Sequence, residues 1–169
     1  LKEAGITTIN LLCSDHGWFS AVRPIIRENL EALGVSVKYD EKKSSDVYSF
    51  VDGDQGAWDV VIAPGDPSVF GNDADLLLRW WYAGDTWTEQ RMHWKGSEAY
   101  TAVQAKLDEA VKLEGEAQIA TWQELFDLLS EQVPLYPIFH RKTPTAYNPQ
   151  TLVGFQPIAL TGLSFVDIG

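Results

Sequence analysis

Residues 7–39 read TTINLLCSDHGWFSAVRPIIRENLEALGVSVKY, and this stretch predicts a strand, a helix and a second strand in succession. The segment 7–13 mixes β-branched with apolar residues, as strands do. Apolar residues recur at helical spacing over 21–33, and Gly34 suits the end of that helix. Residues 35–39 alternate between apolar and polar, as in a strand with one solvated side. The unit therefore has the length and order of a right-handed β-α-β crossover.

The following residues continue this alternation. A short helix is predicted over 42–50 and helices over 97–112 and 116–132. The apolar run DVVIA at 59–63 predicts a central strand covered on both faces. Residues 135–139 are a further strand candidate, and Pro137 favours an edge position for it. The expected fold class is α/β, with a mixed, mainly parallel sheet flanked by helices on both faces.

The length and the net charge of the chain exclude several classes of function. A chain of 169 residues is expected to form one domain with its own core. The net charge of -11 provides no basic face for phosphates, which argues against nucleic-acid binding. The longest apolar runs are about five residues, whereas a membrane-spanning helix needs roughly 20. The single cysteine, Cys13, excludes an internal disulfide and, at the end of an apolar strand, is expected to be a buried core thiol.

Polar residues follow two of the predicted strands. Asp15 and His16 come directly after the first strand, and Asp66 follows the strand at 59–63. Ligands of α/β sheets collect outside the carboxyl ends of parallel strands, so these three side chains are candidates for one site. The alternative is structural, with Asp15 capping a helix, His16 exposed and Asp66 shaping a turn.

Tryptophan is concentrated between residues 76 and 94, a stretch with no clear helical or strand pattern. Trp80, Trp81, Trp87 and Trp94 lie there. Their rings suit a pocket that stacks on a ligand, but they suit a core or a packing surface equally well.

Catalytic and metal-binding signals are weak. A hydrolase would use Asp15, His16 and Asp66, or Cys13 or Ser14 as nucleophile with His16 as base, yet no G-x-S-x-G elbow is present. The three histidines lie far apart in the sequence, and the glycines form neither a dinucleotide fingerprint nor a P-loop. No cofactor, no metal and no enzymatic activity are therefore expected.

Six segments, in order, resemble the C-terminal lobe of family 5 extracellular solute-binding proteins, the oligopeptide- and dipeptide-binding class of bacterial ABC importers. They are LKEAG (1–5), IIRENLEALGVSVK (25–38), GDPSVF (65–70), SEAYTAVQAKLDEA (97–110), ATWQELFDLLSEQVPLYPIF (120–139) and LVGFQP (152–157).

This resemblance implies that residues 1–169 form a single lobe of a longer two-lobe binding protein, with about 153–169 crossing back toward the N-terminal lobe. The protein would capture a peptide or another small solute in the interlobe cleft and deliver it to a membrane permease. It would work outside the cytoplasm, in the periplasm or at the outer face of the membrane, where a lipid anchor upstream of Leu1 would hold it.

The resemblance also implies ligand-binding residues. Asp15, His16 and Trp18 would come from the loop after the first strand, Asp66 from the loop after 59–63, and Trp80, Trp81 and Trp87 from the segment that follows. Peptide-binding members carry an acidic residue about three positions before the Asp-Pro pair, where it binds the peptide amino group. Ala63 stands there in this chain. A protein-interaction domain that docks through its tryptophans is the remaining alternative.

Overall fold

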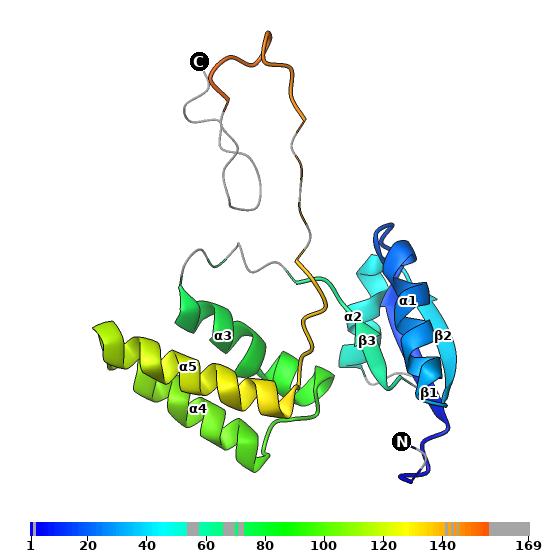
Figure 1. The fold of residues 1–169 in the computed structure, drawn as a ribbon, viewed down its shortest axis with the longest axis horizontal. Coiled ribbons are helices and arrows are strands. Elements are labelled where there is room, and N and C mark those ends of the chain that lie inside the picture. The colour runs from blue at the N-terminus through cyan, green and yellow to red at the C-terminus, as the bar shows by residue number, and fades with distance from the viewer. Residues whose placement is uncertain are drawn as a thin grey trace. The chain divides into compact units, whose positions relative to one another are not determined.

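The computed structural model (Figure 1) describes residue 1, residues 3–53, 58–65, 70 and 73–140, and residues 142, 144 and 146–155. The chain divides into two compact units, Leu1–Gly65 and Asp66–Gly169, and each is described by itself. The expected single lobe stays a prediction. The expected crossing from about residue 153 also stays one, and residues 156–169 lie outside the described part.

Unit 1 is a parallel α/β unit with strands β1 (Thr8–Ser14), β2 (Ser36–Lys42) and β3 (Val60–Ile62). Helices α1 (Phe19–Ala32) and α2 (Ser44–Asp52) connect and cover them. Among the described residues the sheet has three strands in the order β2-β1-β3, and both pairings are parallel. This confirms the expected fold class, a mainly parallel sheet with flanking helices, and the β-α-β crossover at its start.

Strand β1 has both of its faces buried. Leu11 and Cys13 face one side and pack with Phe19 of α1. Leu12 faces the other side and packs with Val47 of α2. Because successive strand residues point to opposite faces, the consecutive residues Leu11, Leu12 and Cys13 contribute to the core on both sides of the sheet.

The prediction that residues 59–63 form the central strand is wrong. The central strand is β1, whereas β3 is three residues long and pairs only with β1 among the described residues. Val60 is 37 % exposed, and of the three β3 residues only Ile62 is buried. A continuous apolar run is typical of buried strands, and both TINLLCS and DVVIA contain one. The apolar pattern therefore does not tell which of the two strands is central in the sheet.

Unit 2 contains helices α3 (Ala74–Tyr82), α4 (Glu98–Ala110) and α5 (Gly115–Gln132), with the π-helix η2 (Thr86–Arg91) between α3 and α4. Ser97 caps α4 as the sequence indicates, since its hydroxyl accepts the Tyr100 N–H at 3.0 Å. The core of the unit consists of Leu78, Tyr82, Val103, Leu107, Leu125 and Leu129. No helix within the described ranges has the length and apolar character needed to cross a membrane.

The strand expected at 135–139 is not formed. This segment has no strand pairing, and Tyr136 is 75 % exposed. Pro137 supplies no backbone N–H, so it removes one of the donors that a ladder through this segment would use. Val133 ends α5 in the left-handed conformation, with φ 46° and ψ 47°.

Candidate functional site

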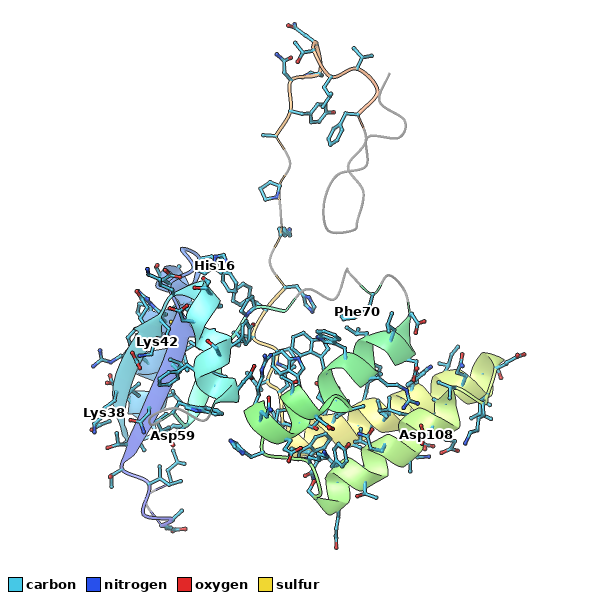
Figure 2. The ribbon with its side chains drawn as sticks, turned by 180° about the vertical axis from the view of Figure 1, so that it is seen from behind. His16, Lys38, Lys42, Asp59, Phe70 and Asp108 are labelled. Atoms are coloured by element: carbon cyan, nitrogen blue, oxygen red, sulfur yellow. The ribbon has the colours of Figure 1, made fainter. Side chains whose placement is uncertain are left out.

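The carboxyl ends of the three strands meet at one edge of unit 1. Because the strands are parallel, Asp15, His16 and Trp18 follow β1 at the same edge where Lys43 follows β2 and Ala63 follows β3. Figure 2 shows His16 at this end of the sheet and Asp59, which precedes β3, at the opposite end. The strand directions behind the predicted site are therefore confirmed, while Asp66 itself lies outside the described residues.

Asp15 holds the start of α2. Its Oδ1 accepts both the backbone N–H and the hydroxyl of Ser44, each at 2.9 Å. The Ser44 hydroxyl, followed by the Ser44 N–H, lowers the pKa of Asp15. The carboxylate thus caps a helix, as the structural alternative expects, but that helix is α2 and not the one that follows Asp15 in sequence. Its role toward a ligand stays a prediction.

His16, Trp18 and Phe19 form a run of aromatic rings beside Asp15. The Trp18 and Phe19 centroids are 3.8 Å apart, and the His16 ring lies 6.2 Å from Trp18 and 6.3 Å from Phe19. Phe19 is buried, Trp18 is half-buried and His16 is exposed. The run therefore leads from the core to the surface and ends in an exposed imidazole ring that a ligand could contact.

The Cys13 thiol is fully buried and hydrogen-bonded. It donates to the Ser14 carbonyl at 3.2 Å, so the Tyr39 hydroxyl, within hydrogen-bonding distance, donates to the sulfur. Burial, followed by the bond to Cys13, raises the pKa of Tyr39. Both nucleophile candidates, Cys13 and Ser14, are buried, and no hydrogen bond joins either of them to His16, all three being described residues.

Sequence reasoning missed three residues of this edge. Tyr39 bonds Cys13, Ser44 bonds Asp15, and the Tyr48 hydroxyl donates to the Pro64 carbonyl at 3.2 Å. The adjacent serines at 44 and 45 are typical of a helix start and could have indicated the cap. Nothing in the sequence pairs Tyr39 with Cys13, because the parallel register that brings β2 beside β1 is a tertiary property.

The tryptophans of unit 2 differ in exposure. Trp87 is buried and packs against Trp81 at a tilt of 52°, with the ring centroids 4.3 Å apart. The Arg91 guanidinium lies over the Trp87 ring, 4.4 Å from its centroid. Trp94 packs edge-on against Tyr100 at 5.6 Å.

Trp80 is 55 % exposed, with the Phe70 ring 5.7 Å away. Of the four clustered tryptophans, all of them within the described ranges, Trp80 alone presents a largely open ring.

The predicted site residues belong to different units. Asp15, His16 and Trp18 lie in unit 1, and Trp80, Trp81 and Trp87 lie in unit 2. A joint site therefore stays a prediction. The described residues include no group of three or more His, Cys, Asp or Glu side chains that could hold a metal ion.

Comparison with solved structures finds a related fold. The crystal structure of NikA from Brucella suis in complex with Fe(III)-EDTA matches with a TM-score of 0.54 and 20 % sequence identity. The match covers 78 % of this chain and 29 % of NikA, so the chain spans less than a third of NikA's length. A scan against models of known protein families finds no match, and a search of curated proteins finds none either.

Proposed function

We propose that the chain is part of the solute-binding component of an ABC transporter and captures a small solute for import. The observation that carries this proposal is the fold shared with NikA over 78 % of the chain, since NikA is a family 5 solute-binding protein of that transporter class. The six sequence segments described above lead independently to the same class. The partners would be the solute, an N-terminal lobe of the same protein and a membrane permease.

Each unit has its own residues proposed to contact the solute, and in unit 1 they lie at the carboxyl edge of the sheet. His16 and Trp18 offer stacking surfaces there, and Asp15 fixes the loop that carries them. Trp80 offers the second surface. Trp81 and Trp87 would act less directly, because their rings pack against each other at a tilt and Trp87 is buried.

A solute with a flat or apolar face suits these groups better than a free peptide amino group does. Such an amino group needs a carboxylate, and Ala63 occupies the position after β3 where peptide-binding relatives carry one. The rings of Trp18 and Trp80 instead favour stacking. The structure of NikA with Fe(III)-EDTA gives one case in this fold of a bound species that is not a peptide.

The proposed location is outside the cytoplasm, in the periplasm or at the outer face of the cell membrane, with a lipid anchor supplied by residues upstream of Leu1. Both are part of what the family resemblance implies. Cell fractionation of the natural full-length protein tests them, and recovery in the cytoplasmic fraction would contradict them.

Binding is tested by titrating peptides, oligosaccharides and metal chelates while tryptophan fluorescence is followed, in the natural full-length protein and in residues 1–169. We expect micromolar binding only by the full-length protein, because one lobe supplies about half of the contacts and cannot close. Trp80→Ala should weaken binding at least about tenfold, as loss of a stacked ring does. Tyr136→Ala, a change at an equally aromatic and 75 % exposed position, is the control.

A protein-interaction role is the second candidate, favoured by the exposed Trp80 ring, which lies beside the half-buried Phe70 ring. This role predicts that Trp80→Ala abolishes capture of a protein partner. It also predicts that neither the full-length protein nor residues 1–169 binds any of the titrated solutes.

A further inference from the structure

Helix α5 has a second apolar face besides the one in the core. Leu125 and Leu129 are buried in unit 2, whereas Ile119 is 57 % and Phe126 50 % exposed. Trp122 is half-buried between them. These three residues, spaced i, i+3 and i+7, lie along one side of the helix and are termed the α5 stripe. Figure 1 shows α5 on the near side of unit 2, with α4 behind it.

A row of carboxylates runs parallel to the stripe. Glu124, Asp127 and Glu131 follow the same i, i+3, i+7 spacing and are exposed. At 100° per residue, Gln123 and Ser130 fall between the two rows. The surface is therefore an apolar band, a narrow neutral seam and an acidic band.

Only one of the three carboxylates of the acidic row has a cationic partner among the described residues. Residues 115–132 contain four carboxylates and no Lys, Arg or His. Lys106 of α4 binds Glu124 at 2.6 Å and Glu109 at 2.9 Å. No ion pair joins Asp127 or Glu131 to a cation among the described residues.

Glu131 is moreover in the last turn of α5, where the helix dipole disfavours negative charge. A carboxylate at this position therefore does not stabilise the end of α5.

A groove of about 250 Å³ lies beside this row, lined by Lys106, Glu124, Asp127, Leu128 and Glu131. Leu128 supplies an apolar wall for a side-chain stem, and the two unpaired carboxylates face the same hollow. A lysine or arginine side chain has this combination of an apolar stem and a cationic head.

We propose that the α5 stripe and the acidic row together bind a basic amphipathic helix of a partner protein. Apolar side chains of that helix cover Ile119 and Phe126, and its Lys or Arg residues reach Asp127 and Glu131 across the seam. The charge pattern argues against a second copy of this chain as the occupant, because its own acidic row would meet like charge.

The test uses residues 1–169 and a fluorescein-labelled, 18-residue amphipathic helix of leucine and lysine, with binding followed by anisotropy at low salt. Ile119→Ser should weaken binding at least about fivefold, and Asp127→Asn with Glu131→Gln at least about tenfold. The same double change should leave the thermal midpoint unchanged or raised, because it removes charge that the helix dipole opposes.

Matched controls separate this site from general attraction to an acidic protein. Ile25→Ser removes an isoleucine that is also helical and 59 % exposed, but on α1. Glu3→Gln with Glu28→Gln neutralises two exposed acids of unit 1. Both controls should change the dissociation constant by less than about twofold.

Three results would overturn the proposal. One is equal weakening by the control variants, which would show unspecific charge attraction. Another is a wild-type dimer in sedimentation that Ile119→Ser dissociates, which would make a second copy the occupant. The third is the absence of peptide binding at low salt. None of these results depends on whether the protein binds a solute.

Discussion

A single oxygen of Asp15 holds both polar groups of Ser44: Oδ1 accepts the backbone N–H and the hydroxyl, each at 2.9 Å. Asp15 directly follows the central strand and Ser44 begins α2, 29 residues later. The bond thus fixes a helix to the edge of the sheet where the candidate site lies. It also gives that edge a dependence on pH.

Stability should fall in acid because of this bond. The pKa of Asp15 is lowered in the fold, so the contribution is fully present above the ordinary aspartate pKa of about 3.9 and is lost as the pH falls through the folded value. Asp15→Asn should flatten this part of the profile of unfolding free energy against pH. Urea unfolding between pH 3 and 7 measures it, with Glu28→Gln as a control that keeps the acid limb. An unchanged profile in Asp15→Asn would contradict the assignment.

The Cys13 thiol should be structural and unreactive. Cys13→Ser places a hydroxyl in a site with no exposed surface and should cost roughly 1 kcal/mol or more. Tyr39→Phe removes the hydroxyl that bonds the sulfur and should cost about 0.5–1.5 kcal/mol.

A thiol reagent should label native protein slowly and urea-unfolded protein at once. Fast labelling of the native form would restore the catalytic interpretation of Cys13.

Trp87 and Trp80 should differ sharply in their effect on folding. Trp87 is 8 % exposed and stacks on Trp81, so Trp87→Ala should cost about 3–5 kcal/mol. Trp80 is 55 % exposed, so Trp80→Ala should change stability by about 0.5 kcal/mol or less. Acrylamide quenching should fall more on removing Trp80 than on replacing Trp94 with Phe. Comparable destabilisation by both alanine variants would place Trp80 in the core.

The β-α-β unit and two of the helix ends were predictable because their signals are local. The β-α-β unit, the Ser97 cap and the left-handed Gly34, with φ 84°, follow from periodicity and from residue-specific backbone preferences. The position of β3 at the edge of the described sheet was not predictable, since strand order depends on tertiary pairing and not on local sequence. The segment 135–139 has strand-like residues, but Pro137 in its middle disfavours a regular ladder.

The strand directions at the candidate site were predictable, whereas the contacts of its residues were not. Parallel strands bring the residues that follow β1, β2 and β3 to one edge, which the pattern of elements already indicates. The partner of Asp15 belongs to a helix that is distant in sequence, and no spacing rule connects them. The tryptophans were recognisable as a group, yet Trp80 and Trp81 are neighbours in sequence, and only the packing of α3 decides that the first is exposed and the second half-buried.

The end of α5 should be strained at Val133. This β-branched residue has φ 46°, in the left-handed region that costs an L-residue roughly 1–2 kcal/mol, and a proline follows it. Asparagine tolerates that conformation, and Val133 is 46 % exposed, so little burial is lost on replacement.

Val133→Asn should therefore raise the free energy of unfolding by about 1 kcal/mol. Val111 is the matched control: it too ends a helix, α4, and is 47 % exposed, but its φ is -71°. Val111→Asn should leave stability unchanged or lower it. Urea denaturation of both variants measures the difference, and an equal effect of the two changes would show that the left-handed conformation at Val133 carries no strain.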